Sequence, residues 1–112
     1  MHYAYMITAP VESPRFNQAL VQLCTDIAAQ ITISQVFFYG DATAIGTLDE
    51  HSDNFQDMID LADEADIALH ICSAAFQRRN YRISQLGQED FHFKGLGQFI
   101  VETTAAEKIR VY

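Results

Sequence analysis

A short run of strand-forming residues, from Ile67 to Ile71, places the strongest constraint on how this chain can fold. The run is apolar except for His70, which is the pattern of a strand covered on both faces. Such strands belong mainly to parallel sheets, because the crossover connections between parallel strands place helices on both sides. The run therefore predicts an α/β domain built on a parallel sheet.

The segments around this strand alternate between strand and helix patterns. Strand patterns cover residues 2–8, 31–39, 67–71 and 108–112. Helix patterns cover residues 14–30, about 53–65, 73–80 and a last stretch that opens at Gly95. Residues 83–93 show neither pattern and are predicted to form a mobile loop. This order predicts a single domain, residues 1–112, with three α/β/α layers and a mostly parallel central sheet.

The composition fits a globular domain. Of the 112 residues, 49% are hydrophobic, which is enough for a core and argues against disorder. No apolar run approaches the length of a membrane-spanning helix. The first residues also lack the basic start and long apolar stretch of a secretory signal. We therefore expect a cytoplasmic location and no membrane partner.

The acidic residues are concentrated in one part of the sequence. The formal net charge is −8, and residues 41–66 contain no Lys or Arg. Nine of the fifteen acids fall in that stretch: Asp41, Asp49, Glu50, Asp53, Asp57, Asp60, Asp63, Glu64 and Asp66. Direct nucleic-acid binding is not expected, because it depends on neutralising phosphates. The stretch is either a solvated acidic face or a docking surface for a basic partner.

Two cysteines are the candidates for chemistry. They are too few for a disulfide framework and lack the spacing of a metal site, so neither a metal nor another cofactor is expected. Cys24 lies beside the apolar stripe of the first helix and is predicted to be a core residue. Cys72 directly follows the buried strand and precedes small residues of good helix propensity.

The position of Cys72 favours a reactive thiol. Unpaired backbone amides at a helix start stabilise a thiolate, which is the nucleophilic form of cysteine. Ser73, Arg78 and Arg79 are possible supporting residues, the two arginines through their positive charge. In a parallel sheet, functional groups gather at the carboxyl ends of the strands, where Cys72 is expected to lie. The alternative is that Cys72 is a small buried hydrophobic residue.

Two neighbouring features are weaker candidates. His70 lies two residues before Cys72, so both side chains point to the same face of an extended strand. A Cys–His pair would resemble the cysteine hydrolases, but a buried, hydrogen-bonded histidine is favoured. Gly95-Leu-Gly97 lacks the spacing and the preceding strand of a phosphate-binding loop.

Four segments in order resemble the TusD and DsrE family of sulfur-carrier proteins. The segment Leu69-His-Ile-Cys-Ser-Ala-Ala-Phe-Gln-Arg-Arg79 looks like the family's active-cysteine segment. Tyr3 to Pro10 resembles its first strand and turn, and Val36 to Tyr39 resembles its second strand. Gly95 to Gly97, followed by a helix and a short strand, resembles its C-terminus.

This resemblance implies a sulfurtransferase of the DsrE-like fold, in which Cys72 accepts sulfane sulfur as a persulfide and passes it to a partner thiol. It also implies that the partners are other sulfur-relay proteins and that the subunits form hetero- or homo-oligomers. In one branch of the family the sulfur ends in 2-thiouridine at the tRNA wobble position, and in another it belongs to sulfur oxidation. Two alternatives stay open: a non-catalytic structural subunit of such a complex, and a flavodoxin-like small-ligand module.

Overall fold

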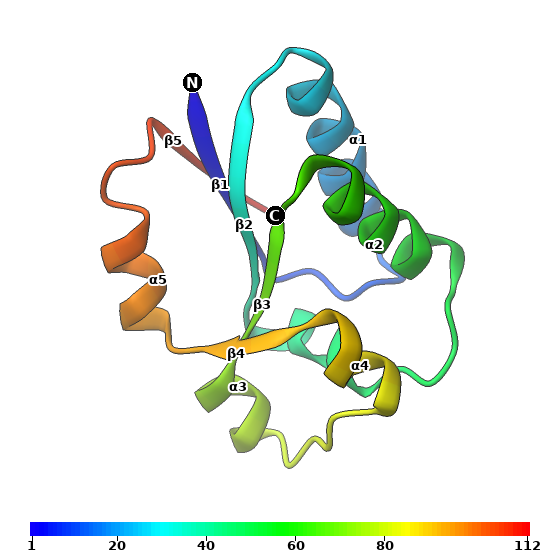
Figure 1. The fold of residues 1–112 in the computed structure, drawn as a ribbon. Helices are drawn as coiled ribbons and strands as arrows, with labels where there is room; N and C mark the ends of the chain where they lie inside the picture. Colours follow the sequence, from blue (N-terminus) through cyan, green and yellow to red (C-terminus); the bar gives the residue numbers. More distant parts are fainter.

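The central element is a five-stranded parallel sheet with helices on both faces (Figure 1). A computed structural model describes the whole chain, residues 1–112. The strand order is β4-β3-β2-β1-β5, so β3 lies inside the sheet and the first strand is inserted between the second and the last. The strands are β1 (His2–Ile7), β2 (Thr32–Phe38), β3 (Ala68–Cys72), β4 (His92–Lys94) and β5 (Lys108–Val111).

The helices connect these strands or close their ends. They are α1 (Pro14–Ala28), the 3-10 helix η1 (Gly40–Thr47), α2 (Asp53–Ala65), α3 (Ser73–Arg78), α4 (Gln85–Asp90) and α5 (Leu96–Glu102). Elements predicted from the sequence begin and end within one or two residues of these bounds. The three-layer α/β/α fold is confirmed, and the sheet is parallel throughout. No helix combines the length and the apolar character needed to cross a bilayer.

Local side-chain chemistry sets the starts of the long helices. The hydroxyl of Ser13 accepts a hydrogen bond from the backbone amide of Phe16 at 3.3 Å, and Pro14 occupies the first helical position of α1. The hydroxyl of Ser52 caps α2 in the same way. Asp66 ends α2 in the left-handed conformation, with φ of 55°.

The prediction of a mobile loop over residues 83–93 is wrong. This stretch forms α4, which is capped by the Ser84 hydroxyl, and then the edge strand β4. Gly87 allows α4 to pack directly on η1, because a Cβ at this position would lie 2.4 Å from the carbonyl oxygen of Gly46. The glycine therefore serves close packing rather than flexibility.

The two faces of the sheet are covered unequally. The helices α1 and α2 lie together on one face of the sheet (Figure 1). The main core lies beneath them and extends to η1, α3 and the residues that flank α4. The opposite face is covered by the short helix α5, whose Phe99 is its only buried residue. On this side of the molecule, large apolar side chains of α5 and β5 are exposed: Ile100, Val101, Ile109 and Val111.

A buried carboxylate ties the helix layer to the end of the sheet. Asp26 of α1 is 2% exposed and accepts a hydrogen bond from the Tyr5 hydroxyl at 2.5 Å. The Arg110 guanidinium of β5 donates to both carboxylate oxygens, at 2.7 and 3.0 Å, and Gln22 donates at 2.9 Å. Burial alone raises the pKa of Asp26, but the hydrogen bonds from Arg110, Tyr5 and Gln22 outweigh it and hold the pKa below its ordinary value.

Replacing Arg110→Ala should lower the free energy of unfolding by about 3 kcal/mol, because it leaves the Asp26 carboxylate buried without its counter-charge. The measurement is urea unfolding followed by circular dichroism. Lys108→Ala is the matched control on the same strand. The Lys108 charge faces the Tyr3 ring and is not paired with a carboxylate, so its removal should lower the free energy of unfolding by less than about 1 kcal/mol. Equal costs for the two variants would contradict the assignment.

The same carboxylate predicts a pH dependence of stability. Since the folded-state pKa of Asp26 is lowered, its stabilisation is present above the unfolded-state pKa, near 4, and is lost as the pH falls below that value. The difference in unfolding free energy between wild type and Asp26→Asn should therefore shrink as the pH falls below about 4. A difference that stays constant down to pH 2 would contradict this.

Candidate functional site

The candidate site lies at the carboxyl edge of the sheet, where β3 ends and α3 begins. Cys72 is the last residue of β3 and the N-cap residue of α3, although its side chain makes no capping hydrogen bond. The helices η1, α3 and α4 gather at this edge (Figure 1). The sequence-based placement of Cys72 at the end of a parallel strand is therefore correct.

The thiol of Cys72 is enclosed. Cys72 is 1% exposed and packs in a small apolar cluster with Phe37 of β2, Ala75 of α3 and Phe99 of α5, and Leu96 packs against this cluster. The rings of Phe37 and Phe99 are stacked, with centroids 4.6 Å apart. The cover of Cys72 thus comes from α5.

Two aromatic residues of the 83–93 stretch, Phe91 and Phe93, follow the Cys72 segment in the sequence but do not cover its thiol. The structure places these aromatic side chains elsewhere. Phe91 belongs to the main core on the other face of the sheet, against Phe38 and Phe55. Phe93 is 45% exposed and packs against Phe76. Neither belongs to the cluster around Cys72.

A chain of polar side chains runs along the same face as Cys72. Lys94 is paired with Cys72 across β3 and β4, so both side chains project from one face of the sheet. Lys94 forms an ion pair with Glu102 of α5, and Gln35 of β2 donates to the same carboxylate at 3.4 Å. His70 is the last member of this chain, and its Nδ1 lies 2.9 Å from the side-chain amide oxygen Oε1 of Gln35.

The surroundings of the histidine next to the site favour its neutral form. Burial lowers the pKa of His70 below its ordinary value, and the positive charge of Lys94 lowers it further. The side-chain NH₂ group of Gln35 donates to Glu102, so its side-chain oxygen Oε1 faces His70. Because this oxygen can only accept, Nδ1 of His70 carries the hydrogen and donates it to Oε1. His70 is therefore half-buried and hydrogen-bonded, as the sequence favoured.

The predicted supporting residues are distributed along α3 and do not converge on the thiol. Ser73 is half-buried and directly follows Cys72, while Arg78 is exposed in the last turn of the helix. The Arg79 guanidinium donates to the Asp41 carboxylate at 3.3 Å and to the Ala75 carbonyl at 3.2 Å. The arginine pair thus lies at the far end of a short helix, and Arg79 is already paired with an acid.

Cys24 is not the core residue that its position beside the apolar stripe predicted. It is exposed, on the side of α1 that faces α2. The stripe of α1 that enters the core consists of Phe16, Ala19, Leu20 and Leu23, and Cys24 lies at its edge. Cys24 and Cys72 therefore lie on opposite sides of the sheet and cannot form one site.

The polar chain beside Cys72 was missed by sequence analysis. Gln35 was the available signal, because it is a polar residue directly before the apolar run Val36–Phe38 and is itself only 4% exposed. Lys94 and Glu102 gave no comparable signal. Lys94 lies in β4, a strand that the sequence did not predict, and Glu102 ends α5, whose position against the sheet the sequence does not indicate. No three His, Cys, Asp or Glu side chains converge as a metal site, and none of the three surface cavities is lined by Cys72.

Known structures share this fold at low sequence identity. The Escherichia coli protein YchN is 15% identical, with all of both chains covered and a TM-score of 0.74. A protein of unknown function from Methanobacterium thermoautotrophicum, MTH1491, is 14% identical, with 99% of this chain and 98% of that chain covered and a TM-score of 0.69. At these identities the likeness shows the fold alone.

Comparison with protein families is more specific. No curated protein sequence matches the chain significantly. The model of one family, described as the DsrE/DsrF-like family, matches residues 1–109. Because this match covers nearly the whole chain and the fold agrees with it, the protein belongs to the DsrE/DsrF-like family.

Proposed function

We propose that this protein is a sulfur carrier that holds sulfane sulfur as a persulfide on Cys72 and passes it to a partner thiol. The DsrE/DsrF-like family is broadly implicated in sulfur relay, which supports the class of reaction. The observation that carries the proposal is the position of Cys72, a thiol at the carboxyl end of an inner parallel strand and at the start of a helix. Cys24, the other thiol, lies outside this site.

The transfer requires two thiolate exchanges and no net oxidation. In the first, the Cys72 thiolate attacks the outer sulfur of a donor persulfide, the donor's S–S bond breaks, and the donor leaves as a thiolate. Cys72 then holds that sulfur in a new S–S bond. In the second exchange an acceptor thiolate attacks the same outer sulfur, and Cys72 leaves as a thiolate.

Lys94 is the side chain best placed to assist these steps. It is the cross-strand neighbour of Cys72 on the same face of the sheet, and in the resting structure its ammonium is paired with Glu102. A positive charge at this position would attract the anionic outer sulfur of a persulfide held on Cys72. Arg78, which is exposed in the last turn of α3, fits the docking of an acidic partner segment, whereas Arg79 is already paired with Asp41.

The reaction requires α5 to move, because Cys72 is almost fully buried beneath Phe99 and Leu96. This helix has seven residues and only one buried side chain, and polar contacts from Lys94 and Gln35 hold its end at Glu102. Such a segment opens at lower free energy than the core. The exposed apolar residues on α5 and β5 offer a surface on which another DsrE-like subunit, the donor or the acceptor, could stabilise the open form.

The burial of Cys72 also favours a second candidate function. A thiol that is 1% exposed fits a non-catalytic subunit of a relay complex, in which Cys72 is only a core residue. In that case the replacement Cys72→Ser would leave complex formation and sulfur flow unchanged. The two candidates differ in one property, which is whether Cys72 accepts sulfur.

Incubation with a cysteine desulfurase and cysteine should add the mass of one sulfur atom to the protein, measured by intact-mass spectrometry. The adduct should persist in Cys24→Ser and disappear in Cys72→Ser. Both variants remove a single thiol, so each is the control for the other. No adduct in any variant, with Cys72 also inert toward alkylating reagents in the presence of relay partners, would identify a structural subunit.

Weakening the attachment of α5 should make Cys72 more reactive. In a Cys24→Ser background, Glu102→Gln removes the carboxylate that holds Lys94, so the helix opens more often and iodoacetamide should alkylate Cys72 severalfold faster. Glu89→Gln, an exposed charge neutralisation on α4, is the control and should leave the rate unchanged. Equal rates in all three proteins would show that α5 does not limit access to the thiol.

A further inference from the structure

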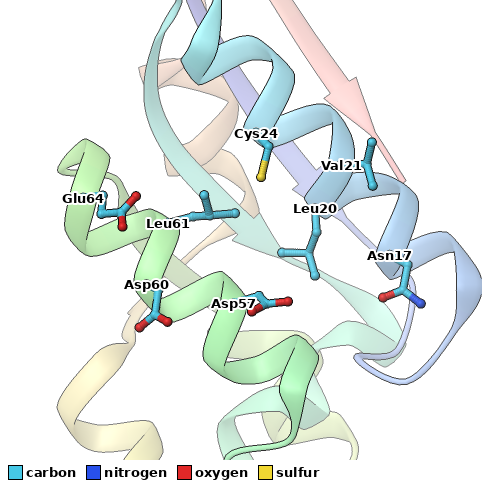
Figure 2. A pocket seen from close by; sticks show the side chains of 8 residues that line it. All are labelled: Asn17, Leu20, Val21, Cys24, Asp57, Asp60, Leu61 and Glu64. Atoms are coloured by element: carbon cyan, nitrogen blue, oxygen red, sulfur yellow. The ribbon is translucent and has the colours of Figure 1, made fainter.

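A groove between α1 and α2 is the largest cavity on the molecule and lies apart from Cys72. Its volume is about 510 Å³. Figure 2 shows Leu20 of α1 and Leu61 of α2 pointing toward each other in it, with Cys24 beside Leu20. Val21 extends this apolar lining and is 67% exposed. Leu20 is itself nearly buried, so the apolar surface that the groove leaves open to solvent comes from Val21 and from the partly buried Leu61.

The α2 side of the groove is acidic. Asp57, Asp60 and Glu64 line it, and none of them takes part in an ion pair. α2 contains no Lys or Arg, and residues 1–77 contain a single Lys or Arg, Arg15, against eleven Asp and Glu. The groove therefore joins an apolar floor to an uncompensated negative wall.

We propose that this groove docks a basic amphipathic helix of a partner protein. Asp57, Asp60 and Glu64 are three and four residues apart and extend over about 10 Å of α2. A helix laid along them would meet each carboxylate with a Lys or Arg at the same three- and four-residue spacing. Its aliphatic residues would cover Val21 and the exposed part of Leu61. Both halves of the surface, apolar and acidic, are then used by one ligand of complementary pattern.

The proposed docking surface is independent of the thiol chemistry. The groove lies on the α1 and α2 face of the sheet, whereas Cys72 packs on the face covered by α5. A partner in the groove leaves α5 free to move, so docking and sulfur transfer can occur at the same time. The inference therefore stands or falls separately from the proposed carrier function.

The test uses a synthetic Ala-rich helical peptide of about 15 residues, long enough to hold a helix once it is bound. It carries a leucine stripe flanked by lysines at three- and four-residue spacing. The groove supplies its own reporter, because Cys24 lines it and is exposed. In a Cys72→Ser background, the bound peptide should slow the alkylation of Cys24 several-fold, and affinity is measured by fluorescence anisotropy.

Two triple variants with the same net charge separate docking from general attraction. Asp57→Lys, Asp60→Lys and Glu64→Lys together reverse the acidic wall, and should weaken peptide binding at least about tenfold and abolish the protection of Cys24. Asp49→Lys, Glu50→Lys and Asp63→Lys reverse three exposed acids outside the groove. This control should bind and protect nearly as wild type does.

Three results would overturn the proposal. The first is binding without protection of Cys24, which places the peptide elsewhere. The second is an equal loss of affinity in both triple variants, which shows attraction by net charge only. The third is equal binding of a peptide with the same composition but a scrambled leucine stripe, which shows that the apolar floor is not used.

Discussion

A parallel sheet has to be covered on both faces, and this constraint determines most of what is distinctive in the molecule. The helices α1 and α2 cover one face together with η1 and part of α3, and the large core lies there. The other face is covered by α5, a helix of seven residues with one buried side chain, and by Ala75 of the short helix α3. The weakly covered face is the one that contains Cys72, so the thiol lies beneath a helix that contributes a single buried side chain.

Sequence patterns predicted those parts of the fold that depend on local chemistry. Ser13 and Ser52 marked the starts of α1 and α2 because a hydroxyl satisfies an amide within three residues along the chain. The apolar run ending at Ile71 indicated an inner parallel strand. The prediction of a loop over residues 83–93 failed because α4 is held by a non-local contact. This contact is the close approach of Gly87 to Gly46, which no local sequence pattern indicates.

The candidate site was predictable in position and not in environment. Cys72 was placed correctly because a strand end is a local feature. Its cover by Phe99, the pairing with Lys94 and the buried polar side chain of Gln35 depend on how three separate segments meet. The exposure of Cys24 depends likewise on the angle between two helices. A helical position at the edge of an apolar stripe does not specify on which side of that edge the neighbouring helix lies.

The bond between Asp26 and Arg110 spans 84 residues of sequence, and this separation has a consequence for how the chain acquires its structure. β1 lies between β2 and β5 in the sheet. In the sequence, α1 follows β1 directly, whereas β5 is the last element. During synthesis on the ribosome, α1 is complete before Arg110, the partner of Asp26, has been made. An unpaired carboxylate in that position opposes burial, so docking of α1 and arrival of β5 become one cooperative event. The first helix is thus committed to its final position only when the last strand is present.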